Sequence, residues 1–136
     1  MKDNFFLDTN VLIYCYSNND PTKRKTAKNI ANSLDAVIST QVIQEFTNAM
    51  TKKYKLSWED AENYVVELED NFLTYINSPS TLRLSCQIAN RYKFSFYDSL
   101  IIAAALESKC KILYSEDMQN GQIIENQLTI VNPFTI

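Results

Sequence analysis

Four acidic residues, Asp8, Glu45, Asp98 and Asp117, stand at positions from which their side chains could gather in one site. Asp8 directly follows a short apolar, strand-like run, and Asp117 nearly follows another. Glu45 and Asp98 fall in the early turns of helix-like segments. The chain contains no histidine, so acid–base chemistry near neutral pH must use carboxylates, a bound metal, Cys, Lys or Tyr.

Several carboxylates in one place repel one another, which raises their pKa values and destabilises the fold unless a cation is present. Ligands that are all oxygen favour Mg²⁺ or Mn²⁺ over zinc or copper. Such ions generate hydroxide from water, hold a phosphate and stabilise charge on a leaving oxygen. The acids therefore indicate hydrolysis of a phosphodiester, with Mg²⁺ or Mn²⁺ as the expected cofactor.

Each acid also has a purely structural interpretation. Asp8 suits a turn or a helix cap, and Asp98 stands three residues after Ser95, which is the spacing of a capping box. Glu45 lies on a polar helical stripe and would then be solvated, and Asp117 would belong to a surface loop. Taken together, acids at the ends of strands and helices favour a functional interpretation. Asp98 is the most informative, because it leads into a nearly all-apolar segment.

Length and composition fit one globular domain over residues 1–136, with 46% apolar and 21% charged residues. The net charge of −3 at first argues against a nucleic-acid partner. However, the candidate site holds four of the sixteen acids, and the other twelve face thirteen Lys and Arg residues. The rest of the chain is therefore near neutrality, and overall charge does not exclude nucleic acid.

Several other classes of site and location are excluded or disfavoured. The single glycine, Gly121, excludes a Walker loop and a GxGxxG dinucleotide fingerprint. Cys15, Cys86 and Cys110 are odd in number and widely spaced, which predicts free, mostly buried thiols in a reducing compartment. No apolar run approaches the roughly 20 residues of a membrane span, and the N-terminus lacks a signal-like stretch. We therefore expect a cytoplasmic protein without membrane contact.

Strand-like and helix-like segments alternate along the chain. Strands are predicted at residues 4–7, 36–39, 111–114 and 128–131, and helices at 22–34, from 40 onward, at 58–76, 80–92 and 95–109. Residues 11–16 fit either a strand or a short helix. This alternation predicts an α/β fold with a mainly parallel sheet and helices on both faces. Ligands of such sheets bind beyond the carboxyl ends of the strands, where Asp8 and Asp117 lie.

Basic and aromatic residues offer weaker signals. Clusters of Lys and Arg within residues 23–28, 52–55 and 91–93 could contact phosphates, although solvated helix surface explains most of them. Spacing places most Tyr and Phe side chains in the core. Tyr14, Tyr16, Tyr54 and Tyr97 could instead stack on unpaired bases.

Four segments resemble the motifs of the PIN-domain family. They are residues 6–13 (FLDTNVLI), 39–46 (STQVIQEF), 97–105 (YDSLIIAAA) and 115–121 (SEDMQNG). Each segment alone is a weak signal, but four in order along essentially the whole chain are specific. The length is typical of the VapC-type toxins of that family.

The resemblance implies a three-layer α/β/α sandwich and a Mg²⁺- or Mn²⁺-dependent endoribonuclease. It assigns the metal-binding and catalytic roles to Asp8, Glu45, Asp98 and Asp117, and orienting roles to the hydroxyls of Thr9 and Ser115. Spacing from Ser115 favours Asp117 over its neighbour Glu116 as the fourth acid. The resemblance further implies that residues 11–16 are helical, a homodimer, an RNA substrate such as tRNA or rRNA, and a VapB-like antitoxin partner.

Two other functions compete with this one. A PIN-like fold without turnover would serve protein interaction, with the acidic segment 58–76 as its contact surface. A metal-dependent phosphatase would use an Asp nucleophile after the first strand. The usual Asp-x-Asp form of that site is absent, because residue 10 is Asn10.

Overall fold

A mainly parallel sheet forms the centre of the protein in the computed structural model, which describes residues 3–135. Its strands are β1 (Phe5–Leu7), β2 (Ala36–Ser39), β3 (Leu73–Tyr75), β4 (Ile112–Tyr114), β5 (Ile123–Ile124) and β6 (Leu128–Val131). Their spatial order is β3-β2-β1-β4-β6-β5, and only the β5–β6 pair is antiparallel. The predicted domain, residues 1–136, extends just beyond the described range at both ends.

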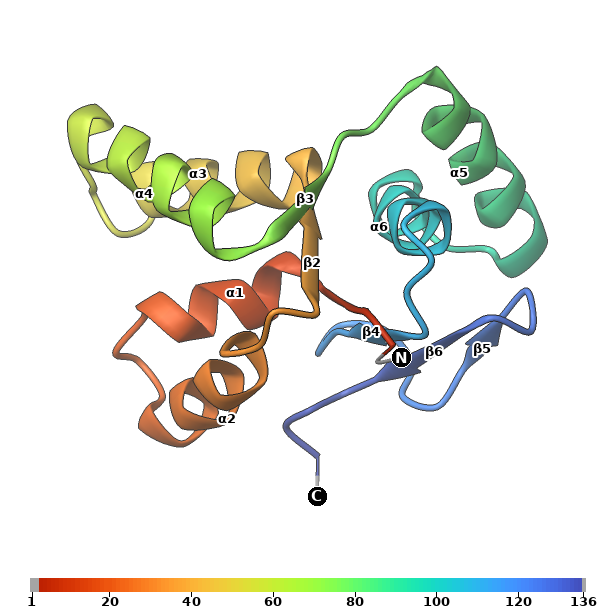
Figure 1. The fold of residues 1–136 in the computed structure, drawn as a ribbon, viewed down its shortest axis with the longest axis horizontal. Helices are drawn as coiled ribbons and strands as arrows, with labels where there is room; N and C mark the ends of the chain where they lie inside the picture. The colour runs from red at the N-terminus through yellow and green to blue at the C-terminus, as the bar shows by residue number, and fades with distance from the viewer. Residues whose placement is uncertain (1–2, 136) are drawn as a thin grey trace.

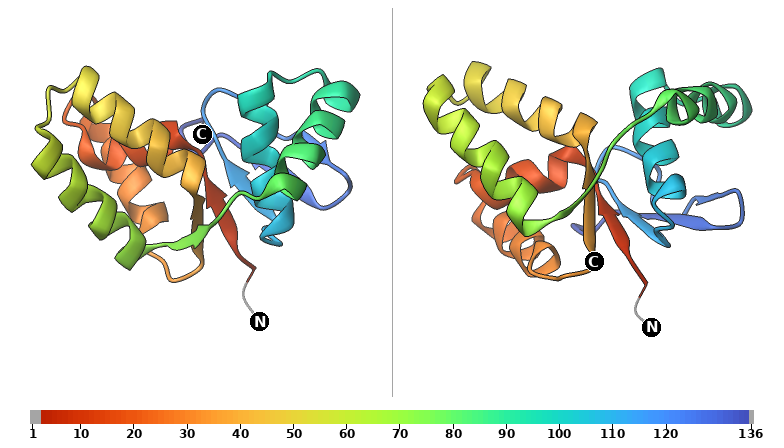
Figure 2. Two further views of the ribbon diagram at one scale, coloured as in Figure 1. Left: turned by 90° about the horizontal axis from the view of Figure 1, so that it is seen from above. Right: turned by 45° about the horizontal axis from the view of Figure 1, so that its top comes forward.

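Helices cover both faces of this sheet. They are α1 (Thr9–Tyr16), α2 (Pro21–Ala31), α3 (Thr40–Lys52), α4 (Trp58–Asn71), α5 (Pro79–Tyr92) and α6 (Phe96–Glu107). The first four lie on one side of the sheet, and α5 and α6 lie on the other (Figures 1 and 2). The predicted α/β class and the three-layer α/β/α sandwich are confirmed. None of the helices in residues 3–135 has the length and hydropathy of a membrane span.

Serine caps fix where two of the helices begin. The Oγ of Ser39 accepts the N–H of Val42 at the start of α3, and the Oγ of Ser95 accepts the N–H of Asp98 at the start of α6. A capping side chain satisfies a backbone donor that the helix itself leaves unpaired. These caps matter for the site because α3 carries Glu45 and α6 carries Asp98.

The core lies where the sheet meets the helices on either side. Phe6, Ile38, Leu113 and Ile130 of the four inner parallel strands are all at most 3% exposed. Helix α6 is buried on nearly every side, from Ser99 to Leu106, because it packs between the sheet and α5. This burial explains why its sequence is apolar all round rather than striped. The helix cannot shift without disturbing the core, so it is a rigid support for Asp98.

The prediction of one long helix over residues 58–76 is wrong at its C-terminal end. Helix α4 ends at Asn71, and Phe72 leaves the helical conformation with φ −127° and ψ 150°. The next residues form β3, which pairs with β2 in the register Val37↔Leu73. Ile76, the last residue of the predicted helix, is 72% exposed. The helical spacing of apolar residues continues past Asn71 without a break. Pairing with β2, and not a local sequence signal, therefore ends the helix here.

Residues 11–16 are helical within α1, as the family resemblance implied. Strand β5 was not predicted; it is two residues long and enters a tight turn that the Gln127 N–H closes onto the Ile124 carbonyl. Glu125 and Asn126 both have positive φ, as the two central residues of a type I′ turn do. Among the cysteines, Cys15 and Cys110 are buried, but Cys86 is exposed.

Candidate active site

The chain reverses direction across the sheet at β1, and the first candidate acid stands there. From β1 the chain passes to β2 and β3 on one side, and it returns later to β4 on the other side. Open parallel sheets bind ligands at such a switch point. Leu7 pairs with Tyr114, and the next N–H, that of Asp8, donates to the Tyr114 carbonyl at 3.0 Å. Asp8 and Ser115 are thus neighbours, and the Ser115 Oγ donates to Asp8 Oδ2 at 2.8 Å.

The first turn of α1 joins Asp8 to Glu45. Asp8 is the N-cap of α1, and its Oδ1 accepts the N–H of Thr9 at 2.7 Å. The Thr9 hydroxyl in turn donates to Glu45 Oε1 on α3 at 2.6 Å. The other Glu45 oxygen accepts from the Gln41 amide at 3.3 Å. Two acids that are 37 positions apart in the sequence are therefore linked through one buried threonine.

Asn10 is a site residue that the sequence prediction missed. Its Nδ2 donates to Asp8 Oδ2 at 3.3 Å and to Asp117 Oδ2 at 3.1 Å. Its Oδ1 accepts the backbone N–H of Glu116 at 3.1 Å. One neutral amide thus bridges the first and the fourth candidate acid. The signal was present in the order Asp-Thr-Asn, but an uncharged side chain does not stand out in a search for titratable groups.

The structure separates Glu116 from Asp117. The Glu116 carboxylate faces α1 and α2, where it pairs with Lys23 and accepts from the Tyr14 hydroxyl at 2.7 Å. Burial acts to raise the pKa of Glu116, but the hydrogen bonds from Lys23 and Tyr14 outweigh it and hold the pKa below its ordinary value. Asp117 instead shares Asn10 with Asp8. Of the two neighbouring acids, only Asp117 faces the cluster.

Asp98 interacts with the other acids through its charge, although no hydrogen bond joins it to them. Burial and the charge of Asp117 raise the pKa of Asp98, although the Ser95 cap lowers it. Asp8 in turn feels the negative charges of Glu45 and Asp98. Each of the four acids therefore lies within electrostatic reach of at least one other. We call Asp8, Glu45, Asp98 and Asp117 the acidic quartet.

Asp8 is the most perturbed member of the quartet. It is only 6% exposed, and burial raises its pKa from 3.8 to about 6. Hydrogen bonds from Ser115 and Thr9 lower this pKa, whereas the charges of Glu45 and Asp98 raise it further. The ionised carboxylate is thus costly in this position. A proton or a nearby positive charge would relieve that cost.

The donor set of the quartet suits a hard divalent cation. Its members offer carboxylate oxygens, with hydroxyl and amide groups beside them, and hard cations prefer oxygen ligands. Among residues 3–135 the ion pairs are Lys23–Glu116 and Arg91–Glu125, so no quartet member is neutralised by a basic side chain. In the same range no three His, Cys, Asp or Glu side chains come close enough together to form a ready metal cluster. Neutral donors such as Asn10 lie between the carboxylates instead, as their mutual repulsion requires.

Comparison with known proteins places the chain in a family. The PIN-domain model matches residues 5–120. The chain belongs to the PIN-domain family. Its fold is similar to that of a toxin–antitoxin complex component from Klebsiella pneumoniae, with 23% identity and a TM-score of 0.73, covering 98% of this chain and 100% of that one. No curated protein matches the sequence.

Two further solved structures share the fold of this PIN domain. The sarcin–ricin-loop-cleaving toxin VapC20 of Mycobacterium tuberculosis has 17% identity and a TM-score of 0.67, covering 84% of this chain and 90% of that one. VapBC2 of Rickettsia felis, bound to a fragment of its promoter DNA, has 15% identity and a TM-score of 0.66, covering 94% and 98%. At these identities the likeness concerns the fold alone.

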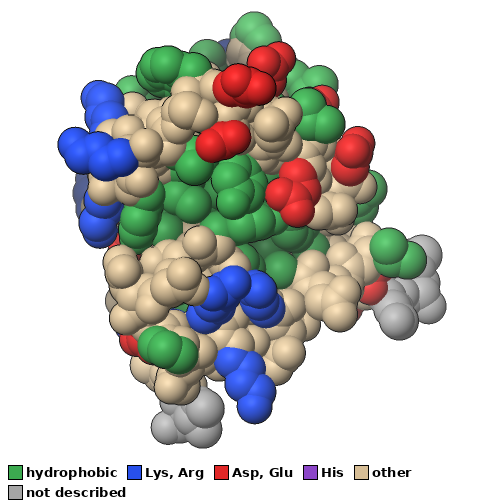
Figure 3. All heavy atoms as spheres, turned by 90° about the vertical axis from the view of Figure 1, so that its left-hand side faces the viewer, with side chains coloured by type: hydrophobic (Ala, Val, Ile, Leu, Met, Phe, Trp, Pro, Cys, Tyr) green, Lys and Arg blue, Asp and Glu red, His purple; other side chains and the backbone are tan. Residues whose placement is uncertain are grey.

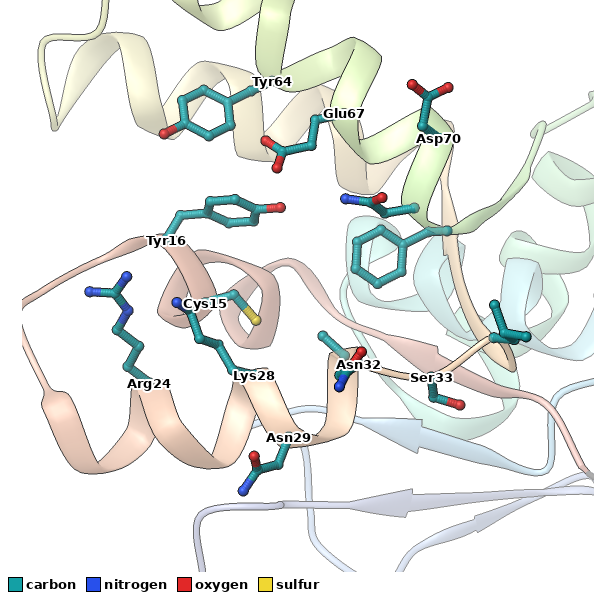
Figure 4. Close-up of a pocket in the computed structure, with 14 residues that line it drawn as sticks. Cys15, Tyr16, Arg24, Lys28, Asn29, Asn32, Ser33, Tyr64, Glu67 and Asp70 are labelled. Atoms are coloured by element: carbon teal, nitrogen blue, oxygen red, sulfur yellow. The ribbon is translucent and has the colours of Figure 1, made fainter.

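The PIN domain also carries a large groove between α2 and α4, with a volume of about 840 Å³. Tyr16 and Tyr64 line it in edge-to-face contact, with ring centroids 5.3 Å apart. Lys28 and Arg24 stand on the α2 wall, and Glu67 on the α4 wall (Figure 4). On the surface this region is an apolar hollow with basic side chains on one side and acidic ones on the other (Figure 3).

The raised pKa of Asp8 predicts a specific pH dependence of stability in metal-free protein. Because the folded state binds this proton more tightly than the unfolded chain, ionisation destabilises the fold, and the cost is relieved as the pH falls from about 6 towards 3.8. Asp8→Asn removes the ionisation. Relative to wild type, its free energy of unfolding should therefore gain roughly 2 kcal/mol between about pH 4.5 and about pH 7.5.

Urea denaturation of both proteins at the two pH values, with a chelator present, measures this difference. Comparing the two pH values cancels any constant cost of replacing hydrogen bonds to Asp8. A variant that loses stability relative to wild type as the pH rises would show that ionised Asp8 stabilises the fold, contrary to this account.

Proposed function

We propose that this PIN domain is a metal-dependent endoribonuclease that hydrolyses RNA phosphodiester bonds and acts as the toxin of a toxin–antitoxin pair. The observation that carries the proposal is the acidic quartet at the switch point of the sheet. Its members come from four separate elements, and Asn10, Thr9 and Ser115 tie three of them together. A purely structural role for each acid would not require this convergence.

Mg²⁺ or Mn²⁺ is the proposed cofactor, with Asp8, Glu45, Asp98 and Asp117 as its ligands. Such an ion, when bound, activates water and stabilises the charge that develops on the phosphate and the leaving oxygen. The chain itself supplies orientation. Ser115 and the Thr9 N–H each hold one oxygen of Asp8, which fixes the plane of a carboxylate that would otherwise rotate.

Neighbouring groups orient the other acids in the same way. The Thr9 hydroxyl and the Gln41 amide hold the two oxygens of Glu45. The Asn10 amide donates to one oxygen of Asp117, whose side chain is otherwise exposed to solvent. Partners of this kind commonly control both the affinity of a metal site and its activity.

RNA is the proposed substrate because the reaction class and the fold both point to a nucleic-acid phosphodiester. The similar toxin VapC20 is described as cleaving the sarcin–ricin loop. We accordingly propose a structured RNA, either rRNA or tRNA, as the target. A cytoplasmic location and a homodimeric state complete the proposal.

An antitoxin segment is the proposed occupant of the groove between α2 and α4. Similar folds occur in toxin–antitoxin complexes, and the groove combines an aromatic lining with walls of opposite charge. An amphipathic helix laid into such a groove buries its apolar face and pairs its flanking charges. At the groove edge, Leu34 is 93% exposed, so it would be covered only by a partner.

Substitution of the quartet tests the nuclease activity. Asp98→Asn and Asp117→Asn should each lower kcat/KM for RNA cleavage about 100-fold or more, because each removes a charge that holds the cation. Glu116→Gln is the matched control: this side chain faces Lys23 and Tyr14, and most of the activity should remain. Cleavage is followed on a labelled RNA hairpin with Mg²⁺ or Mn²⁺.

Equal activity of the quartet variants and wild type would refute the assignment. If the protein binds Mn²⁺ through the quartet but cleaves no RNA, the result favours the phosphatase function. Hydrolysis of a model phosphomonoester then tests that function. Absence of any quartet-dependent Mn²⁺ binding would favour the interaction module without turnover.

Removal of the bridging amide tests the role of Asn10. Asn10→Ala should weaken Mn²⁺ binding and RNA cleavage by roughly 10- to 100-fold, because Asp8 and Asp117 lose the hydrogen-bond donor that fixes their relative positions. Calorimetry gives the Mn²⁺ affinity, and Asn29→Ala, an exposed asparagine on α2, is the control. Unchanged affinity in Asn10→Ala would leave the bridge without a functional role.

Adding negative charge to the groove tests the antitoxin proposal. Lys28→Glu and Leu34→Asp, both at exposed positions, should weaken binding of the protein encoded beside this chain at least about tenfold, while RNA cleavage in vitro is unchanged. Lys52→Glu on α3 is the control. If both groove variants bind that protein as wild type does, the antitoxin occupies another surface.

A further inference from the structure

Two exposed aromatic rings lie directly before Asp98. Among residues 3–135 the exposed aromatic side chains are Trp58 at 75%, Tyr97 at 65% and Phe96 at 42%. Two of these three therefore stand at the start of α6, in the turn that carries a quartet acid. Their rings meet edge to face, with centroids 5.4 Å apart and planes at 72°. This contact restricts the orientation of the Tyr97 ring although most of its surface is open.

The backbone beneath these rings is anchored to the quartet. The buried side chain of Gln41 donates through Nε2 both to the Tyr97 carbonyl at 3.1 Å and to Glu45 Oε2 at 3.3 Å. The Ser95 cap fixes the same turn from the other side. The position of Tyr97 relative to the acids is therefore set by side chains that also orient the site.

The electrostatics of this region disfavour binding of RNA through phosphate contacts alone. The quartet is negative, and neither ion pair of the described residues includes one of its members. A phosphate must nevertheless approach these acids for the proposed reaction. An aromatic face binds a neighbouring base by stacking, which does not require positive charge. Stacking of this kind selects bases that are unpaired, because paired bases already stack within a helix.

We propose that Tyr97, with Phe96 against it, is a stacking platform for an unpaired RNA base next to the cleaved bond. The inference rests on the proposed nuclease function and adds a residue that positions the substrate: a ring that binds an unpaired base and that a continuous duplex would not engage. Tyr97 takes the stacking role because it is the more exposed ring and adjoins Asp98 directly. Phe96 supports it.

A substitution series with a fluorescent base tests the platform. The probe is an RNA hairpin with 2-aminopurine in its loop, compared with a fully paired duplex of the same loop sequence, both with Mn²⁺. Tyr97→Leu should raise the KM for the hairpin roughly 5- to 100-fold and abolish the fluorescence change on binding. Tyr97→Phe and Tyr97→Trp, which keep an aromatic face, should retain both signals.

The matched control is Trp58→Leu, which removes another exposed aromatic ring, at the start of α4. Melting temperatures of all variants should stay close to wild type, because these rings are exposed. A merely structural role for Tyr97 would move the melting temperature but not distinguish hairpin from duplex.

Three results would overturn the platform. Wild-type KM and fluorescence in Tyr97→Leu, with RNA cleavage intact, would refute it while leaving the nuclease function standing, as would an equal loss in Trp58→Leu. A changed oligomeric state with unchanged RNA binding would identify the rings as a contact between copies of this chain. Failure of wild type to bind or cleave either RNA would refute the nuclease function and the platform together.

Discussion

Burial of one carboxylate close to other carboxylates is the constraint on which the organisation of this protein depends. The parallel pairing of β1 with β4 places Asp8 at the centre of the molecule, where it is almost fully buried. The start of α6, the first half of α3 and the loop after β4 then bring the negative charges of Asp98, Glu45 and Asp117 towards it. Burying the Asp8 carboxylate near these charges costs free energy that ordinary packing does not return. Of the four acids only Asp8 is buried, and Glu45, Asp98 and Asp117 are partly or fully open to solvent.

Neutral hydrogen-bond donors surround the acids and reduce the free-energy cost of burying Asp8. Neutral donors, the Asn10 amide and the hydroxyls of Thr9 and Ser115, lie between or against the carboxylates, whereas the cation Lys23 is engaged by Glu116 outside the cluster. Neutral donors orient an acid without cancelling its charge. A lysine within the quartet would stabilise the metal-free fold but compete with a bound cation. The pairing of Lys23 with Glu116 also ties the loop that carries Asp117 to α2, away from the charges themselves.

Much of the fold was predictable because its local and tertiary signals agree. Strands β2 and β6 have the predicted bounds, and the starts of α3 and α6 follow from their serine caps. Strand β3 was not predictable, because the helical periodicity of α4 runs on into it and only pairing with β2 decides the matter. The gathering of the acids followed from their places at strand and helix ends and from the family resemblance. The order Asp-Thr-Asn places Asn10 beside Asp8, but its hydrogen bond to Asp117 arises only because β1 and β4 lie side by side.

Binding of a divalent ion by the acidic quartet can be observed in a crystal structure of the protein grown or soaked with Mn²⁺, with the ion located by its anomalous scattering. An anomalous peak should lie at the quartet, within about 2.2 Å of carboxylate oxygens from at least two of Asp8, Asp98 and Asp117. The same peak should disappear in Asp98→Asn. A peak only elsewhere, for example at Glu116 or Glu125, or none at the quartet with Mn²⁺ in excess, would contradict the claim that this charge cluster is built to hold a divalent ion.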